Sequence, residues 1–498
     1  MRAEIIVVGG GTAGCAVAGR LAEAGERVLL IEAGPDFGPV DSGRWPQALL
    51  DPSLMPVDRH SWNYVNTGQH GAPNMAMPRA KVMGGCSSHN GCAVVWGHRE
   101  DYDGWEAAGN DGWGANDLLP YLQMANERFR VHVPRVSDLT PFHQTVIEAA
   151  PGAGLPPIAD FSDLDIDHGL GPGPVNISDR LRWNASFAYI DPVRELPNFH
   201  VMAETSVERL LLDGNKVVGV VTRGPDGVQE ILGSQVVLAG GAYGTPLLLQ
   251  RSGIGDPDDI EPHGIDVRIE LPGVGRNLQD HPALAVDYTG TPELTALLDD
   301  FVAKGGLPRE EGTIALFSSG RCEGPFDMHL YPIAHRNGPG DWSIFIATAV
   351  MAPRSAGRIR ISSADPDAQP VIEHCYLTDP DDYDLEALCD GLEMARVLGA
   401  SEPLASLIGD ETGSYVDCRS REQIRAQIPL SSAHDYHPSS TCKMGPSSDP
   451  MAVVDTVGAV YGVVDLSIAD ASIFPSVTWA NTNLPALAVA EKIVAELI

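Results

Sequence analysis

Lysine is scarce in this sequence. Only five of its 498 residues are lysines, and 33 basic side chains stand against 67 acidic ones, for a formal net charge of 33 − 67 = −34. A field of that sign repels phosphate backbones and anionic membrane surfaces, so the composition argues against a nucleic-acid or membrane partner. Solubility or salt tolerance is the simplest explanation for the acidity. The field would also attract a cationic substrate, and only the site residues can decide whether that attraction is used.

Other features are missing as well. No uninterrupted apolar run is long enough to span a bilayer, and no charged leader precedes an apolar segment and a cleavage site. The eight cysteines are dispersed without a CxxC pair or zinc-finger spacing, so we expect reduced thiols and a cytoplasmic protein. With 43% hydrophobic and 20% charged residues, the composition is that of a globular protein. The length allows three domain-sized units or two larger, interrupted ones.

The first 36 residues predict a dinucleotide-binding unit. A buried strand at 4–8, a glycine-rich turn at 9–14, a helix at 15–24 and a second buried strand at 27–31 follow one another. Gly9 allows the tight turn, Gly11 lets the backbone approach a pyrophosphate, and Gly14 allows close packing of helix on strand. Glu32, which lies 32 − 14 = 18 residues beyond Gly14, would accept hydrogen bonds from ribose hydroxyls. Its carboxylate argues against NADP, while FAD and NAD both remain open.

No second complete unit of this kind follows, which favours a flavoprotein whose other domain handles the substrate. Strands are predicted at 206–212 and 217–221, joined as a hairpin, and again at 235–239 and 466–470. A helix is predicted at 484–498, with Asn481, Thr482 or Asn483 able to cap it. The segment 134–174 is rich in Pro, Gly and Asp and is interpreted as loops. Distant strands thus return to one nucleotide-binding sheet.

Five blocks, in family order, resemble the signatures of the glucose-methanol-choline (GMC) oxidoreductases, with the spelling at 85–90 closest to choline oxidase-like members. They lie at 80–90, 241–255, 273–282, 437–445, and 470–472 with 481–483. The resemblance implies an α/β fold in which a Rossmann-type FAD-binding domain carries a second, α+β substrate domain with an antiparallel sheet. We expect the FAD-binding domain to comprise 1–150, 200–285 and 430–498, and the substrate domain 151–199 and 286–429.

The cofactor implied by the resemblance is FAD. His89 matches the histidine that choline oxidase-like members attach covalently to the flavin ring; a noncovalent flavin contact is the alternative. The amides that begin the last helix could stabilise negative charge on reduced flavin. The residues implied at the FAD are Gly9, Gly11, Thr12, Ala13, Gly14, Glu32, Ala33, Trp62, Val82, Gly85, Ser88, His89, Asn90, Ala93, Val207, Asp470, Ala471, Thr482 and Asn483.

Two residues are expected to act on the substrate. Oxidation of an alcohol requires loss of the hydroxyl proton as hydride leaves the carbon, and His437, in the family's HPxxT block, is the expected base. Asn481 matches a position held by His or Asn in the family and would hydrogen-bond the substrate oxygen; helix capping is its other role. His434 could suggest a metal pair with His437, but no further ligands at usable spacing are seen, so no metal is expected.

The expected substrate is an uncharged primary alcohol, aryl, furanic or aliphatic, oxidised to an aldehyde while oxygen becomes hydrogen peroxide. Choline would require an aromatic cage and a carboxylate. Gly91 and Asp435 depart from choline oxidase-like members, which carry a hydroxyl residue and an apolar one there. A choline oxidase or dehydrogenase, a sugar oxidase, a carrier-linked alcohol dehydrogenase and a hydroxynitrile lyase remain alternatives, and a homodimer is left open. The cage candidates are Trp62, Tyr64, Tyr331, Trp342 and Trp479.

Overall fold

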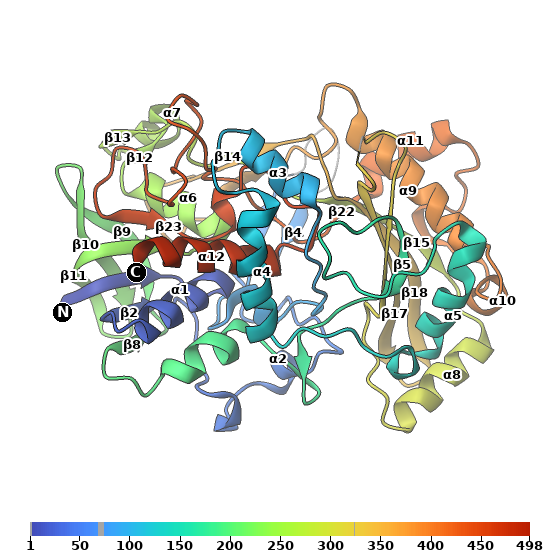
Figure 1. The fold of residues 1–498 in the computed structure, drawn as a ribbon. Helices are drawn as coiled ribbons and strands as arrows, with labels where there is room; N and C mark the ends of the chain where they lie inside the picture. Colours follow the sequence, from blue (N-terminus) through green and yellow to red (C-terminus); the bar gives the residue numbers. More distant parts are fainter. Residues whose placement is uncertain (1, 68–73, 323) are drawn as a thin grey trace.

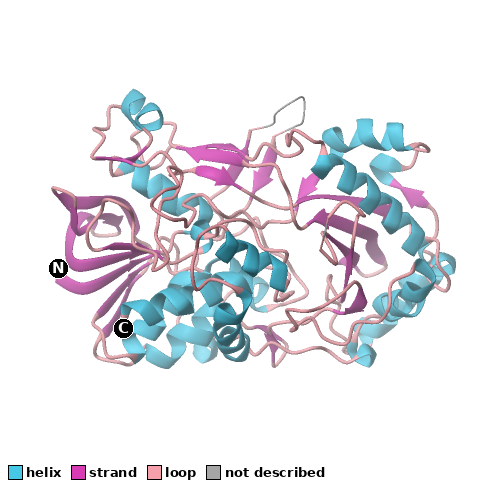
Figure 2. Ribbon diagram, turned by 45° about the horizontal axis from the view of Figure 1, so that its top comes forward, coloured by secondary structure: helices cyan, strands magenta, loops and turns pink. Residues whose placement is uncertain are grey.

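Two large β-sheets lie in opposite halves of the molecule in the computed structural model, which describes residues 2–67, 74–322 and 324–498. Figure 1 shows both chain ends beside the first sheet, with the last helix packed next to the first one. Figure 2 shows the same division from a second direction, with the second sheet flanked by its own helices. Segments far apart in the sequence therefore meet in each half.

The first sheet is mixed. Its core is parallel, with β23 also pairing with β11, and β9 and β10 extend it as antiparallel strands. Both faces of the parallel part are covered, which explains why β1 and β2 are runs of Ile, Val and Leu rather than alternating patterns. The strand order is β8 (Phe199–Met202), β2 (Val28–Ile31), β1 (Arg2–Val8), β11 (Gly227–Leu238), β10 (Lys216–Gly224) and β9 (Ser206–Asp213), with β23 at Leu466–Ile468.

The helices of this half pack on the sheet and on one another. α1 and α4 both contact α12, so the first and last helices of the chain share one layer. α6 follows β11 directly and contacts β9. The helices are α1 (Thr12–Glu23), α2 (Gln47–Leu50), α3 (Arg99–Ala107), α4 (Ala115–Arg128), α6 (Gly241–Arg251), α7 (Pro257–Ile260) and α12 (Asn483–Leu497).

The second sheet is antiparallel throughout, and α9 packs against its strands β15, β17 and β18. Its strand order is β21 (Glu411–Thr412), β15 (Pro282–Tyr288), β18 (Asp341–Val350), β17 (Met328–Gly338), β16 (Thr313–Phe317) and β5 (Gly169–Pro172), with β22 (Ala433–His434) beside β15. Its helices are α5 (Pro141–Ala149), α8 (Pro292–Ala303), α9 (Tyr383–Gly399), α10 (Ala405–Ile408) and α11 (Arg421–Ser431).

Three smaller sheets complete the fold. A five-stranded one joins distant parts of the chain in the order β14 (Arg276–Leu278), β19 (Gly357–Arg360), β20 (Val371–Glu373), β3 (Tyr64–Asn66) and β4 (Met75–Met77). Two pairs stand apart, β12 (Ile254–Gly255) with β13 (Ile269–Glu270), and β6 (Ile177–Ser178) with β7 (Leu181–Arg182). Within the described ranges, no helix is both long and apolar enough to cross a bilayer.

The expected α/β architecture with a separate antiparallel sheet is confirmed, as is the hairpin of β9 and β10. The interpretation of 134–174 as loops is wrong in part, because α5 and β5 lie within it. Pro141 occupies the first turn of α5, where its missing N–H costs nothing, and the Thr140 hydroxyl caps the helix by accepting from the His143 N–H. Prolines there mark a helix start rather than a loop. Thr482 stands at the N-cap of α12 without a side-chain capping bond.

Gly14 is the tightest contact between α1 and the preceding turn, since a Cβ there would overlap the Gly9 carbonyl oxygen. We expect Gly14→Ala to lower the free energy of unfolding by about 1–3 kcal/mol, the usual cost of overpacking, in chemical denaturation. Gly104→Ala is the matched control, because Gly104 lies within α3 and a Cβ there meets no atom within 4 Å. That change should be neutral or stabilise by up to ~1 kcal/mol. Equal denaturation midpoints for both variants would contradict the packing argument.

Candidate active site

A cavity of about 1000 Å³ opens where β1 and β2 end and reaches the second sheet. Val8 and Ile31, the last residues of these strands, line it at one side, and Ala285 of β15 and Ala347 of β18 line it at the other. The carboxyl ends of parallel strands are the usual place for a nucleotide in an open α/β sheet. The cavity is thus large enough for a dinucleotide at one end and a small substrate at the other.

The dinucleotide end fits FAD in its backbone. A Cβ placed on Gly11 would meet nothing nearer than the Cα of Gly85, at 3.9 Å, so the space beside this turn is left free for a ligand. The Glu32 carboxylate is held by the N–H groups of Gly10 and Gly34, each at 2.7 Å, and burial raises its pKa. Glu32 lines the cavity, where ribose hydroxyls would need acceptors.

Enclosed polar atoms at the cavity wall also fit a bound cofactor. Within the described part of the chain, His89 Nδ1 and Asn483 Nδ2 are buried without a hydrogen-bond partner, and both residues line the cavity. Buried polar atoms normally find partners, so these two imply a ligand that supplies them. Together with the free space at Gly11 and the held Glu32 carboxylate, they make this chain able to hold FAD.

The structure brings nearly all of the expected cofactor residues to this cavity, and His437 and Asn481 line it too. Gly14, Val82 and Ser88 do not line it. Gly14 packs against the Gly9 carbonyl, Val82 is 1% exposed in the core, and the Ser88 hydroxyl donates to the Met83 carbonyl at 3.0 Å. The cavity-lining members are Gly9, Gly11, Thr12, Ala13, Glu32, Ala33, Trp62, Gly85, His89, Asn90, Ala93, Val207, Asp470, Ala471, Thr482 and Asn483.

Asp470 has a supporting task as well. Its Oδ2 accepts from the Gly241 N–H at 2.8 Å and from the Thr245 hydroxyl at 2.6 Å, and its Oδ1 accepts from the Ser472 N–H at 2.8 Å. Burial raises the pKa of this carboxyl. By tying the start of α6 to the segment after β23, Asp470 fixes two walls of the cavity.

His437 and Asn481 meet at the substrate end. The Asn481 Nδ2 lies 3.4 Å from His437 Nε2. On its other side, His437 Nδ1 lies 2.9 Å from His281 Nδ1, and His281 Nε2 lies 3.0 Å from the Thr478 carbonyl oxygen. A carbonyl only accepts, so His281 Nε2 must carry the proton. Neutral His281 then has a bare Nδ1, which requires His437 to donate from its own Nδ1.

This hydrogen-bond chain leaves His437 Nε2 unprotonated and in the cavity. Burial lowers the pKa of His437 well below the ordinary histidine range, and the neighbouring His281 lowers it further, against an opposing effect of Asp280. Burial likewise lowers the pKa of His281 to about 4. Both imidazoles are therefore neutral at pH 7, and His437 Nε2 is available to accept a proton.

Asp435 and Glu311 are among the carboxyl groups that line the substrate end. Burial is the main cause of a raised pKa at both: well above the ordinary range for Asp435, and to about 7 for Glu311. Asp435 Oδ2 is 3.4 Å from His437 Nδ1 and has no hydrogen-bond partner among the described residues. Glu311 stands beside Gly91, where a Cβ would come within 3.0 Å of its carboxylate. The sequence departs from choline oxidase-like members at Gly91 and Asp435. A carboxyl group of the cavity lies at each place: Glu311 beside Gly91, and Asp435 itself.

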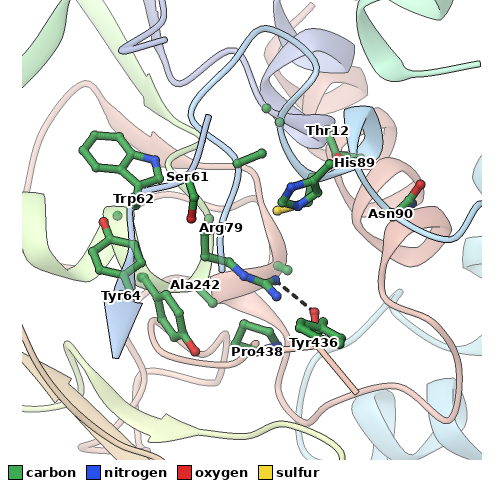
Figure 3. A pocket seen from close by; sticks show the side chains of 18 of the residues that line it. Thr12, Ser61, Trp62, Tyr64, Arg79, His89, Asn90, Ala242, Tyr436 and Pro438 are labelled. Atoms are coloured by element: carbon green, nitrogen blue, oxygen red, sulfur yellow. Dashed lines mark hydrogen bonds between the residues drawn. The ribbon is translucent and has the colours of Figure 1, made fainter. Parts of the chain in front are cut away.

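Arg79 and Cys86 are cavity residues that the sequence left unassigned. Figure 3 shows Trp62 and Tyr64 on one side of the view, His89 and Asn90 on the other, and Arg79 between them. Arg79 Nη1 donates to the Tyr436 carbonyl at 2.9 Å. Burial acts to raise the pKa of the Cys86 thiol, but Arg79 and His89 outweigh it and lower that pKa to about 6. Both residues belong to or adjoin the block at 80–90, so their position in that block was an available signal.

The aromatic cage considered for choline does not form from the candidate residues. Trp62 and Tyr64 line the cavity but stack on each other, with ring centres 6.0 Å apart and planes 5° apart. The Lys81 ammonium already lies over Trp62, at 4.5 Å. Trp342 and Trp479 do not line the cavity. Tyr331 lies outside its lining too, and its hydroxyl is 2.6 Å from His329 Nδ1.

Potential metal ligands are closer to His437 than sequence spacing suggested. Donor atoms of His281, Asp435 and His437 all lie within 4.8 Å of one another, and no ion is part of this structure. His434, the residue first paired with His437, instead has its Nε2 3.0 Å from the Ala76 carbonyl. Further potential ligands therefore do stand near His437, contrary to the expectation from sequence spacing, because the fold brings in His281 from a distant segment. The expectation of no metal stays a prediction.

Comparisons with known proteins agree with this site. Two family models described as GMC oxidoreductase match residues 3–283 and 353–490. Human mitochondrial choline dehydrogenase is 34% identical, with 98% of this chain and 88% of that protein covered, and Arthrobacter globiformis choline oxidase is 32% identical, with 98% and 93% covered. The solved structure of pyridoxine 4-oxidase from Mesorbium loti is 27% identical, with a TM-score of 0.85 and 99% and 98% coverage. The chain therefore belongs to the GMC oxidoreductase family.

Proposed function

We propose that this protein is an alcohol oxidase that converts a primary alcohol to an aldehyde and passes the electrons to oxygen. Membership in the family makes it an FAD-dependent oxidoreductase acting on CH–OH donors. The observation that carries the proposal is the unprotonated His437 Nε2, which the chain through His281 directs into the cavity beside Asn481. Uncharged aryl, furanic or aliphatic alcohols are the first candidate substrates.

Bound FAD supplies the hydride acceptor for such a reaction. His437 Nε2 takes the hydroxyl proton, and the positive charge that develops on its ring is shared through Nδ1 with His281 and lies near Asp435 and Asp280. Asn481 Nδ2 donates to the substrate oxygen as negative charge grows on it. The Asp280 carboxylate accepts hydrogen bonds from the backbone N–H of His437 at 2.7 Å and of His281 at 2.9 Å. These bonds fix the backbone positions from which both imidazole side chains extend.

Oxygen as the acceptor is supported by relatives that are named oxidases, choline oxidase and pyridoxine 4-oxidase. A carrier-linked dehydrogenase is the alternative. One relative, human choline dehydrogenase, is named a dehydrogenase. Hydrogen peroxide formed in equal amount to the aldehyde would favour the oxidase. A hydroxynitrile lyase would leave the flavin oxidised when an alcohol is added under anaerobic conditions.

The first test is anaerobic addition of a panel of aryl, furanic, aliphatic, amino and sugar alcohols to the purified holoenzyme. We expect at least one primary alcohol to bleach the flavin absorbance. His437→Ala should slow bleaching by at least about 10²-fold, since it removes the base, while the bound-flavin spectrum is retained. His281→Gln should slow it less, because the base remains but its orientation is released. Bleaching of the His437→Ala variant at the wild-type rate would contradict the assigned role.

We also propose that FAD is attached covalently to His89. The support is its match to choline oxidase-like members and its place at the cavity wall, 4% exposed with Nδ1 free of any partner within the described residues. The Cys86 thiol stands beside this imidazole, and Arg79 and His89 lower the pKa of that thiol to about 6.

The linkage is tested by acid precipitation. We expect the wild-type pellet to stay yellow and a flavin-bearing peptide containing His89 to appear by mass spectrometry. His89→Asn should release all flavin into the supernatant while the folded protein still binds it, because the other cavity contacts remain. A colourless wild-type pellet would show that FAD is held noncovalently.

A second candidate substrate is an alcohol that carries a protonated amine. Glu311 and Asp435 supply carboxyl groups at the substrate end, and the net charge of −34 would attract a cation. Asp435 was one of the reasons to expect an uncharged alcohol, yet the structure places its carboxyl in the cavity. A hydrogen-bonding ammonium suits these carboxyls better than a quaternary one, since the candidate aromatic cage is not formed.

The two candidates differ in pH dependence. With a pKa of about 7, Glu311 is neutral below pH 7 and ionised above it. If an amine is bound, the KM for an amino alcohol, taken relative to that for an uncharged alcohol, should fall about tenfold from pH 6 to pH 8. Glu311→Gln should remove this trend. Glu310→Gln is the matched control, because Glu310 is paired with His335 at 2.6 Å and should matter less. A constant ratio in the wild type would leave the uncharged alcohol as the substrate class.

The domain limits at 1–150, 200–285 and 430–498 against 151–199 and 286–429 also stay proposals, as do the cytoplasmic location and the homodimer. Within the described residues, no disulfide joins any of the eight cysteines, which is compatible with a reducing compartment. A nucleic-acid or membrane partner remains unexpected on grounds of charge.

A further inference from the structure

A second cavity, of about 790 Å³, lies between the segment 132–138, the second half of α8 and the segment 304–309. Arg309 lines this cavity, while the next two residues, Glu310 and Glu311, line the catalytic one. The chain at 307–311 is therefore a partition between the two cavities. Nothing in the proposed oxidation uses the far side of that partition.

The outstanding feature of the second cavity is the guanidinium of Arg309. The residue is only 7% exposed, and its Nη1 is enclosed without a hydrogen-bond partner. Within the described ranges, no carboxylate accepts a hydrogen bond from this Nη1, although Arg is effectively always charged in proteins. Burial lowers the pKa of Arg309, and the more distant Cys92, Asp138 and Glu311 oppose that effect. A buried cation without a counter-ion is unfavourable, so the site needs an anion.

Two of the three carboxylates that line this cavity are already paired with other cations. Asp138 is paired with Arg135 at 3.0 Å, and Asp300 is paired with Lys304 at 2.6 Å. The third, Asp179, lies 3.4 Å from the Ser178 hydroxyl. Arg180 adds a further guanidinium to the cavity wall, where its Nη1 donates to the Gly305 carbonyl at 3.1 Å. The charge balance at the wall therefore favours an anion brought from outside.

Much of the remaining wall is apolar. Leu297 and Phe301 of α8 face the cavity together with Val175, Ile177 and Leu307. Inorganic phosphate would leave this surface without a partner, whereas an organic acid would cover it and gain from the burial of apolar area. The guanidinium fork also matches the geometry of a carboxylate with two parallel hydrogen bonds.

We propose that this cavity binds a small organic carboxylate, with the carboxylate on Arg309 and its apolar body against Phe301 and Leu307. The ligand is accepted locally in spite of the net charge of −34, because the cavity wall contributes unpaired positive charge. Bound there, the anion is separated from the catalytic cavity only by the segment 307–311. The proposal does not depend on which alcohol the enzyme oxidises.

The test is isothermal titration of the holoenzyme with benzoate, with phosphate and benzyl alcohol as comparison ligands. Flavin absorbance is recorded in parallel, because binding in the catalytic cavity should perturb the flavin and binding in the second cavity should not. We expect benzoate to bind at a site silent in the flavin spectrum, and Arg309→Met to weaken that binding at least about tenfold. Arg135→Met is the matched control, since Arg135 lies at the same cavity but is paired with Asp138, and it should bind benzoate like the wild type.

Phe301→Glu gives an independent check, because it keeps Arg309 and supplies a carboxylate from within the chain. It should also abolish the spectrally silent binding. Thermal melting and the bound-flavin spectrum establish that each variant is folded. Benzoate binding by Arg309→Met at wild-type strength would overturn the proposal, as would phosphate binding as tightly as benzoate or the absence of any silent site in the wild type. None of these outcomes depends on catalysis, so they are distinct from a failure of the proposed oxidation.

Discussion

The catalytic end of the cavity depends on one buried carboxylate, that of Asp280. Its Oδ1 accepts from the backbone N–H groups of His281 and His437, and its Oδ2 accepts from the Tyr376 hydroxyl at 2.8 Å. Burial acts to raise its pKa, but the surrounding histidines outweigh this and lower it, so Asp280 stays ionised at neutral pH. The Asp280 carboxylate thereby connects three segments that are far apart in the sequence, those of His281, Tyr376 and His437. Removing this carboxylate would leave the backbone N–H groups of His281 and His437 without their hydrogen-bond acceptor, at the point where the two imidazoles contact each other.

Electrostatics inside the molecule differ from the surface average. The protein carries a large negative charge, yet the two cavities described above differ in their charged groups. Carboxyls with raised pKa values stand at the substrate end of the first, and the second has a guanidinium whose Nη1 has no hydrogen-bond partner within the described residues. Net charge affects which charged ligands are attracted to the protein surface. Which ligand a cavity binds depends on the burial and pairing of the charged groups inside it. The same acidic composition is therefore compatible with a cation in one cavity and an anion in the other.

Much of this arrangement follows from the sequence where the signal is local. The strand, turn and helix at the amino terminus and the hairpin of β9 and β10 depend on apolar runs and glycine positions, and both are confirmed. The prediction of loops at 134–174 was wrong at α5, because a proline is tolerated in the first turn of a helix and the sequence does not show where that helix starts. His281, Glu311 and Arg309 were not assigned roles, since each acquires its meaning from partners, or from a lack of partners, distant in the chain. Most of the expected FAD residues and both expected substrate residues meet at one cavity, and their roles stay predictions.

Gly91 shows how such a long-range dependence constrains sequence change. Its missing side chain is what leaves room for the Glu311 carboxyl, which a Cβ would approach to 3.0 Å. A side chain at position 91 and the Glu311 carboxyl would therefore meet in the same volume, so a larger residue at 91 fits only if that carboxyl shifts. A change at position 91 thus acts on an acid more than two hundred positions later, at the wall of the catalytic cavity.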